Sequence, residues 1–203
     1  MGMPVTLQGK NNADALVDLK ATEGGVLWTD VARYYTSRGY GWQVISTSAV
    51  ASLVLRPSST SALTLYNNSA KSYVIERVFA HNLVAASNCV SVLWICSHPI
   101  GMTAPTGNDI TIRNNTSGLS AGTEGVVDTA EGVADNGWFP WGQDSSVVTV
   151  TTPGGILEAR VYGRIIVPPT AGISVQVVSS VTTGTFTHGL HWFSVPASEL
   201  TVN

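Results

Sequence analysis

The chain has 203 residues, of which 44% are hydrophobic and only 11% are charged, with a formal net charge of −3. This composition excludes a disordered chain, which has few apolar residues and a high net charge. The Lys and Arg residues are scattered singly, so there is no basic stripe for nucleic acid and no nucleic-acid partner is expected. No apolar run approaches the ~20 residues of a membrane-spanning helix, so no membrane partner is expected either.

Short strands separated by Gly, Pro, Ser and Asn are predicted from residue 43 onward. After a first segment at 43–55, Leu63 and Leu65 share one strand face while Thr64 and Tyr66 take the other. The next segments are rich in β-branched and aromatic residues, as strands are. These further candidates are residues 72–84, 89–96 and 109–113.

The C-terminal third predicts strands most clearly. Residues 156–167 alternate between apolar and polar side chains, which is the period-two pattern of a half-buried strand. Their apolar members are Leu157, Ala159, Val161 and Ile165. A strand at 145–152 precedes this segment, and the segments "ISVQVVSSV" and "TFTHGLHWFSV" follow it. Roughly nine strand candidates at this spacing predict an all-β sandwich or barrel.

Two regions depart from the strand pattern. Residues 1–42 are polar and irregular, and we expect an N-terminal arm there, followed by a β-domain over 43–203. The segment "LWTDVARYYTSRGYGW" within the arm fits either a short helix or an irregular strand. Residues 114–137 form a long Gly-, Thr- and acid-rich connection. Loops of this length are uncommon unless they serve function or contact a partner.

The segment "NGWFPWGQ" at 136–143 follows this connection and carries Trp138, Phe139 and Trp141. Large aromatic side chains are mostly covered in folded proteins, and they are enriched at the centres of interfaces. We therefore expect a packing or subunit-contact cluster, with sugar stacking as the alternative. Further candidates for a binding or subunit interface are Trp28, Tyr34 and Tyr35 in the arm.

No catalytic or metal constellation is predicted. His188 and His191 are three residues apart, so a continuous strand directs them to opposite faces and they do not form a metal pair. Their ring nitrogens are expected to bond to nearby backbone or to a neighbouring chain. Cys89 and Cys96 are too far apart in one strand to form a disulfide, which predicts reduced, buried thiols. Neither cysteine has a basic residue beside it in sequence, so no activated nucleophile is expected.

The acidic residues near the long connection are expected to be solvated. They include Asp128, Glu131, Asp135 and Asp144, and they lack the spacing of a calcium loop. The protein is therefore predicted to be non-enzymatic and to need no metal or cofactor.

The segments "LTLYNNSAKSYVIERVFAHN" and "GRIIVPPTAGISVQVVSSVTTGTFTHGLHWFSVP" resemble the jelly-roll virion proteins of tailed bacteriophages, above all head decoration (cement) proteins. The resemblance covers roughly residues 43–196 and rests on the strand–Pro-Pro–Gly–strand rhythm and the Trp-containing closing strand. It implies an antiparallel jelly-roll sandwich of two sheets. The family's proteins are often trimeric, which implies a homotrimer bound to the major capsid protein. It also implies a location on the outer capsid surface after synthesis in the host cytoplasm.

Two functions follow from this resemblance. The first is a structural capsid decoration protein, in which the aromatic residues are buried between chains or plug one end of the sandwich. The second is a tail-fibre or receptor-binding jelly roll that recognises a host-surface glycan. A glycan is the less favoured partner, because three aromatic rings on a free surface would form a sticky patch.

Overall fold

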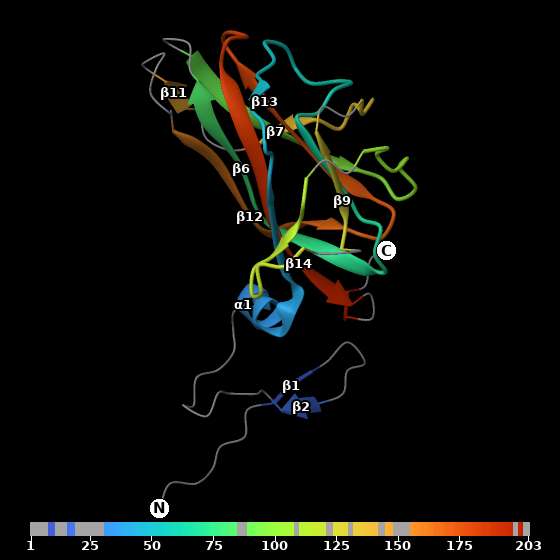
Figure 1. Cartoon of the computed structure of the whole chain (residues 1–203). Helices are drawn as coiled ribbons and strands as arrows, with labels where there is room; N and C mark the ends of the chain where they lie inside the picture. The colour runs from blue at the N-terminus through green and yellow to red at the C-terminus, as the bar shows by residue number, and fades with distance from the viewer. Residues whose placement is uncertain are drawn as a thin grey trace, which may run out of the picture.

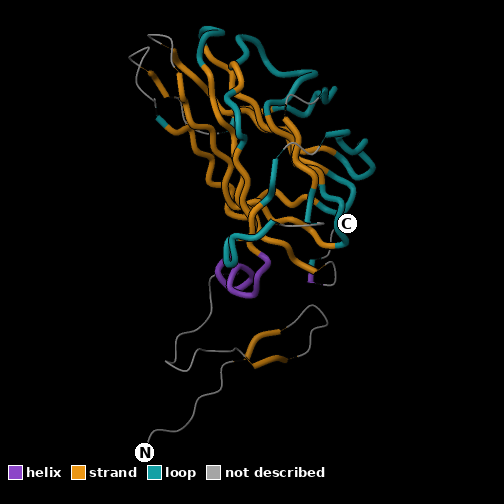
Figure 2. The backbone as a smooth tube through the Cα atoms, in the orientation of Figure 1, coloured by secondary structure: helices purple, strands orange, loops and turns teal. Residues whose placement is uncertain are grey.

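Two antiparallel sheets pack face to face and make the protein an all-β sandwich (Figure 1). The computed structural model describes residues 8–10, 16–18, 31–84, 89–107, 110–120, 124–129, 132–141, 145–147, 155–196 and 199–200. Figure 2 shows that strands dominate this part of the chain. Neither helix in it is long and apolar enough to cross a membrane.

The first sheet, here called the β14 sheet, has the strand order β12-β6-β14-β3-β8, and β4 also pairs with β14. Its strands are β3 (Gly41–Ile45), β4 (Val50–Ala51), β6 (Lys71–Val84), β8 (Arg113–Asn114), β12 (Ile156–Val167) and β14 (Thr185–Pro196).

The second sheet, here called the β13 sheet, has the order β10-β7-β13-β5-β9, and β11 also pairs with β7. Its strands are β5 (Leu63–Tyr66), β7 (Cys89–His98), β9 (Val126–Thr129), β10 (Phe139–Pro140), β11 (Ser145–Val147) and β13 (Gly172–Ser179).

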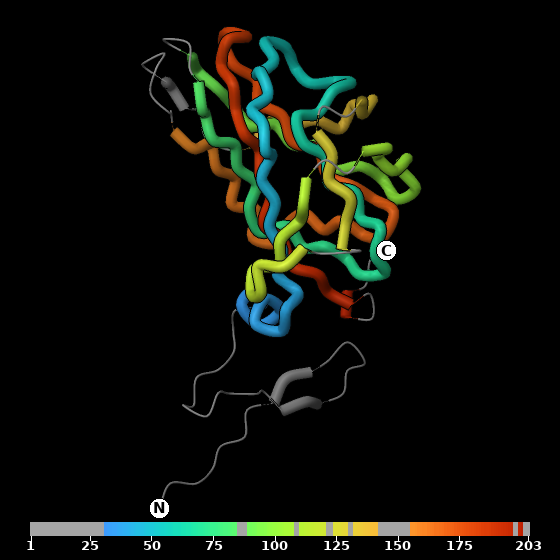
Figure 3. The backbone as a smooth tube through the Cα atoms, viewed as in Figure 1, coloured from blue at the N-terminus to red at the C-terminus, as the bar shows by residue number. Residues whose placement is uncertain are grey.

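The order of the strands is that of a jelly roll. The last strand, β14, lies between β3 and β6, while β13 lies between β5 and β7. The chain therefore crosses from one sheet to the other as it passes from β5 to β6, from β6 to β7, from β12 to β13 and from β13 to β14. Figure 3 shows the result for the first and last strands, because the blue β3 lies beside the red β14. The predicted antiparallel jelly-roll sandwich is confirmed.

Period-two alternation builds the core between the sheets. Leu63 and Leu65 on β5 and Leu157, Ala159 and Val161 on β12 all point into one continuous apolar cluster. Both cysteines are buried and free, as predicted.

A large bulge interrupts β12. The strand advances five residues, from Arg160 to Ile165, while its partner β6 advances only two, from Arg77 to Ile75. Tyr162 and Gly163 in this bulge have φ angles of 51° and 72°. Bulky side chains rarely adopt such a left-handed conformation, because Cβ crowds the backbone.

Part of the predicted arm is packed on the sandwich. β1 (Gln8–Lys10) pairs with β2 (Leu16–Asp18), and the other residues before 31 lie outside the described part of the chain. A short helix, α1 (Val31–Tyr35), continues into the π-helical turn η1 (Thr36–Tyr40) and then directly into β3. The ring of Tyr35 stacks on Phe193 of β14, with centroids 5.4 Å apart. Of the two conformations that fitted this segment, the helix forms over residues 31–40, and β3 begins at Gly41.

Two local predictions were wrong. In the predicted strand 109–113, residues 110–112 are not in a strand, and only Arg113 belongs to one, β8. Ile110 and Ile112 are nevertheless buried in the core. The long connection 114–137 contains β9, which pairs with β5 along the edge of the β13 sheet. A four-residue strand gives too short an alternation to stand out from its Gly- and Thr-rich surroundings.

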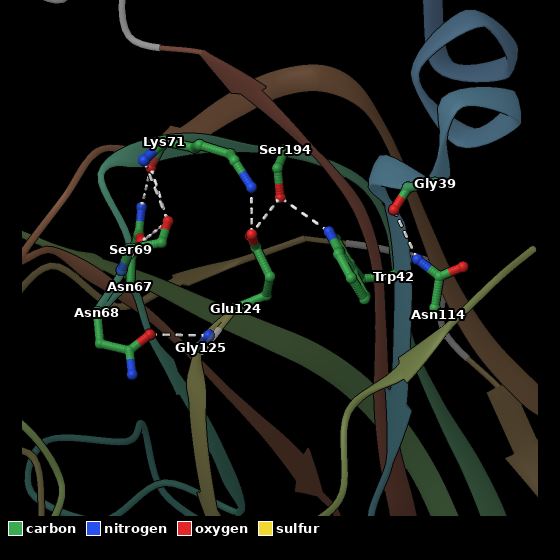
Figure 4. A network of polar contacts seen from close by, with 10 residues as sticks. All are labelled: Gly39, Trp42, Asn67, Asn68, Ser69, Lys71, Asn114, Glu124, Gly125 and Ser194. Carbon is green, nitrogen blue, oxygen red and sulfur yellow. Dashed lines mark hydrogen bonds and ion pairs between the residues drawn. The ribbon is translucent and has the colours of Figure 1, made fainter. Parts of the chain in front are cut away.

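A polar network joins the sheets beside the η1 turn (Figure 4). Glu124, two residues before β9, accepts hydrogen bonds from the Lys71 ammonium and from Ser194 Oγ. Ser194 Oγ in turn accepts from the indole Nε1 of Trp42, at 2.8 Å. The Lys71 ammonium also lies 5.0 Å from the ring centre of Tyr40. This network ties β3, β6 and β14 to the opposite sheet through one carboxylate.

Candidate functional site

The predicted aromatic cluster is packed against the protein's own core. Trp138 is only 2% exposed, and Arg56 donates a hydrogen bond to its carbonyl at 3.1 Å. Phe139 and Trp141 are half-buried against the main core, with their ring centres 5.4 Å apart. The segment forms the edge strand β10, where Phe139 pairs with Ile95. These contacts are those of a packing cluster, and a role between subunits stays a prediction.

The candidates in the arm occupy different environments. Tyr35 is buried against Phe193, and its hydroxyl donates to the carboxylate of Glu199. Burial, followed by this contact, raises the pKa of Tyr35 above its ordinary value. Tyr34 is exposed and receives a hydrogen bond from Arg38 at 2.8 Å. Trp28 lies outside the described residues.

The outward-facing side of the β14 sheet presents several exposed apolar side chains among charged ones. We call it the outer face. Tyr162 is 64% exposed there and stands on the strained bulge of β12. Ile45, Ile156 and Ile166 are exposed apolar residues of the same side. A sheet face that meets only water normally carries polar side chains at its outward positions.

Phe79 forms the centre of the outer face. Its ring covers Gly189, the residue directly opposite on β14, and a Cβ at 189 would lie 2.2 Å from Phe79 Cζ. The Arg77 guanidinium lies 4.8 Å from the ring centre. The His191 ring meets the Phe79 ring edge-on, with centroids 5.6 Å apart. The glycine thus lets an aromatic ring lie flat across the sheet.

A hollow of about 510 Å³ opens beside Phe79. Its polar lining includes Gln43, Arg113 and His191. Nearby, Glu158 receives hydrogen bonds from Arg160 at 2.7 Å and Arg77 at 3.1 Å. These two arginines hold the pKa of Glu158 below its ordinary range. The outer face therefore combines aromatic rings, aliphatic side chains and fixed polar groups.

The two histidines of β14 point to opposite faces, as predicted. His191 lies on the outer face, whereas His188 is fully buried in the sandwich. The backbone of Phe186 is the polar group that acts on the His188 ring, but neither ring nitrogen forms a hydrogen bond of regular geometry in the described part of the chain. A hydrogen bond from His188 to a neighbouring chain stays a prediction. The neighbours of His188 along the inward face, Phe186 and Leu190, are apolar. Burial lowers the pKa of His188 to about 3.

A second polar cluster lies on the outward side of the β13 sheet and is covered by loops. Its centre is His98, whose side chain is only 2% exposed. His98 Nδ1 lies 2.7 Å from Asp135 Oδ2, and His98 Nε2 lies 2.7 Å from Ser174 Oγ. Cys96 Sγ lies 3.8 Å from the same Nδ1 atom. We call Cys96, His98 and Asp135 the Cys-His-Asp cluster.

Strand geometry brings these residues together. Cys96 and His98 are two residues apart on β7, so both side chains leave the same face of the sheet. Ser174 is the cross-strand partner of Cys96 on β13, and it also contacts Thr64 Oγ1 of β5 at 2.7 Å. Asp135 comes from the loop above and accepts a hydrogen bond from the Gly137 N–H at 2.7 Å. The loop therefore closes over a polar row that crosses three strands.

Sequence analysis missed this cluster, although one signal was present. Side chains alternate between the two faces of a strand, which separates His188 from His191. The same alternation places Cys96 and His98 on one face. The contribution of Asp135 has no local signal, because it arrives from a loop 37 positions later. The prediction that the acidic residues are solvated is wrong for Asp135 and also for Asp128. Asp128 is buried, and its carboxylate accepts a hydrogen bond from the Gly107 N–H at 3.0 Å. Glu131 and Asp144 lie outside the described residues.

The protonation states in the cluster follow from burial and hydrogen bonding. Burial, together with the neighbouring Asp135 charge, raises the pKa of the Cys96 thiol to about 12. Burial opposes ionisation of Asp135, but the hydrogen bonds from Gly137 and His98 outweigh it and lower the pKa of that carboxyl. Cys96 is therefore a neutral thiol beside an ionised carboxylate.

The contacts of Ser174, His98 and Asp135 follow the order of a serine–histidine–aspartate relay. A nucleophile must reach the substrate atom that it attacks. Ser174 has no exposed surface and lies in the middle of the sheet, bonded to Thr64. This arrangement holds His98 in a fixed orientation and offers no serine oxygen to a substrate. The prediction that the protein is not an enzyme stays a prediction.

The chain was compared with family models, curated proteins and solved structures, and no match was found.

Proposed function

We propose that the chain is a non-enzymatic structural protein of a virion, a capsid decoration protein that binds and stabilises the major capsid lattice as an oligomer. The jelly-roll fold and the low charge of the chain support this function. In this proposal the outer face of the β14 sheet contacts neighbouring copies of the same chain, as a homotrimer requires. The capsid lattice is bound by the assembled oligomer.

The observation that carries the proposal is the conformation of Tyr162. Its left-handed backbone costs roughly 1–2 kcal/mol in a non-glycine residue, yet its ring is 64% exposed and contributes little to the core. Strained conformations persist where the strain serves function. An aromatic ring held out on a bulge is a suitable anchor for a neighbouring subunit, because aromatic residues dominate interface energetics.

The composition of the outer face supports the same function. Ile45, Ile156 and Ile166 lie on the same face as Phe79, which also carries the ion pairs of Glu158 with Arg77 and Arg160. Interfaces between subunits are enriched in aromatic residues and arginine relative to the rest of the surface. Closed oligomers form when one such patch meets its neighbour repeatedly around an axis.

Sedimentation of the Tyr162→Gly variant tests the self-contact. The wild type is expected to sediment as an oligomer, and the variant to associate at least about tenfold more weakly, since interface anchors contribute about 2 kcal/mol or more. Thr170→Gly is the matched control, because Thr170 is exposed and also has a positive φ, 63°, but lies in the turn before β13. A monomeric wild type, or equal effects of both variants, would contradict the proposed contact. Cosedimentation with capsids assembled without this chain tests lattice binding.

The hollow beside Phe79 favours one alternative function, a receptor-binding module for a host-surface glycan. Its volume of about 510 Å³ suits a small ligand. An aromatic ring with Gln43, Arg113 and His191 around it offers an apolar surface and planar polar groups to a sugar. In this alternative, Gln43→Ala abolishes binding on a glycan array and leaves the sedimentation unchanged. An array with no bound glycan for the wild type would exclude it.

A further inference from the structure

We propose that Cys96, His98 and Asp135 bind one zinc ion, or a divalent transition-metal ion of the same preference, at the base of the loop-lined hollow above the β13 sheet. The inference is independent of the proposed function, since it concerns the opposite sheet. Its ligand atoms are Cys96 Sγ, His98 Nδ1 and Asp135 Oδ2, and binding of the ion displaces the thiol proton of Cys96 to solvent.

The spacing of the three atoms fits such an ion. They all lie within 4.8 Å of one another, with Sγ–Nδ1 at 3.8 Å and Nδ1–Oδ2 at 2.7 Å. A tetrahedral zinc ion with bonds of about 2.0–2.3 Å sets its ligand atoms roughly 3.3–3.8 Å apart. The sulfur–nitrogen distance is already suitable, and the carboxylate oxygen needs to withdraw by less than about 1 Å.

The surroundings already orient the ligands. Ser174 Oγ contacts His98 Nε2 at 2.7 Å, which leaves Nδ1 directed at the Cys96 and Asp135 atoms. Metal-binding histidines usually hold their second nitrogen in this way. Asp135 is fixed from its other oxygen by the Gly137 N–H, and its own N–H donates to the Ser58 carbonyl at 3.1 Å.

The absence of a side chain at Gly137 eases the close approach of the loop. A Cβ at this position would lie 3.0 Å from Asp135 Oδ1 and 3.4 Å from Cys96 Sγ. The glycine at the start of the aromatic segment thus lets the main chain pass over the cluster. It places the Asp135 carboxylate above the strand that carries Cys96 and His98.

The cluster also borders a hollow, from which an ion and a fourth ligand could reach it. His98 and Asp135 line a hollow of about 500 Å³, together with Pro99, Met102 and Thr103. Three protein ligands with a fourth position facing a hollow are typical of zinc sites that hold a water molecule. One sulfur, one nitrogen and one oxygen ligand favour zinc over calcium or magnesium, which prefer oxygen ligands alone.

The test is metal titration of the intact, chelator-treated protein. Zinc is expected to bind at one ion per chain, and cobalt to give the absorption band of a thiolate–cobalt bond. Cys96→Ser should abolish that band and weaken zinc binding at least about tenfold. Ser174→Ala, which removes the contact to His98 Nε2, should weaken binding about 10- to 100-fold.

Cys89→Ser is the matched control, because Cys89 is also buried and free on β7 but lies outside the cluster. It should bind zinc and cobalt as the wild type does. A wild type without stoichiometric binding, or the same cobalt band in the Cys96→Ser variant, would overturn the proposal. The wild-type titration needs no variant, so it can overturn the proposal even if a substitution prevents folding.

Discussion

The ring of Phe79 lies across the backbone of Gly189, its direct cross-strand partner, so closely that a Cβ at position 189 would fall 2.2 Å from Phe79 Cζ. An aromatic side chain that covers a glycine on the neighbouring strand shields the exposed backbone and helps to fix the register. On the outer face the close contact with Gly189 also sets the position of the Phe79 ring, which Arg77 and His191 contact.

Gly189→Ala is therefore expected to destabilise the protein by about 1–3 kcal/mol, because the new methyl group displaces the ring. In a Phe79→Ala background the same substitution should be neutral or stabilise by up to about 1 kcal/mol, since alanine is favoured over glycine within a strand. Urea unfolding of the four proteins in the cycle measures this coupling. Equal effects of Gly189→Ala in both backgrounds would show that the ring does not depend on the glycine.

The sequence predicts most of the fold because the strands carry local periodicity. The alternation of Leu157, Ala159 and Val161 is enough to place their side chains in the core. The same alternation does not predict the bulge that follows in β12, where Tyr162 has a positive φ. That conformation depends on the pairing of β12 with β6, which no local pattern encodes.

The candidate sites were less predictable for the same reason. The aromatic segment was visible as a run of large side chains, yet its packing on the core depends on pairing with β7. In the Cys-His-Asp cluster, the alternation of side chains along β7 predicts that Cys96 and His98 share a face. No such local pattern predicts the contribution of Asp135 from a loop. The outer face is assembled from β3, β6, β12 and β14, so its apolar residues become one surface only when the jelly roll closes.

Trp138 and Trp141 are expected to differ in their effects on stability. Trp138→Ala should cost about 3–5 kcal/mol, as for other buried aromatic side chains, because Trp138 is 2% exposed. Trp141 is half-buried, so Trp141→Ala should cost clearly less. Unfolding measured below the concentration at which the chain associates separates folding from assembly. If Trp138→Ala leaves this stability unchanged but dissociates the oligomer, the cluster is a subunit contact.

Residues 31–42 are expected to be needed for a stable sandwich. A chain that begins at residue 43 lacks the buried Trp42 indole, which donates to Ser194, and the Tyr35 ring stacked on Phe193. It should lose more than about 3 kcal/mol of stability relative to a chain that begins at residue 31. Thermal unfolding of these two truncations makes the comparison. Equal midpoints would support a domain boundary at residue 43.

His188 is expected to make the protein sensitive to acid. Burial lowers its pKa from 6.5 to about 3 in the folded protein, so between these values the unfolded chain binds a proton that the folded chain does not. The stability from this residue is complete above pH 6.5 and is lost as the pH falls toward 3. Each pH unit in that window costs about 1.4 kcal/mol.

His188→Leu should remove this dependence and leave the stability at pH 7 unchanged or higher, because it removes two buried nitrogens without hydrogen-bond partners in the described chain. Between pH 7 and pH 4.5 the wild type should lose about 3 kcal/mol more than the variant. Urea unfolding at the two pH values measures the difference, and the other titrating groups cancel because both proteins share them. Parallel losses in the two proteins would mean that the buried imidazole gains a proton without unfolding the sandwich.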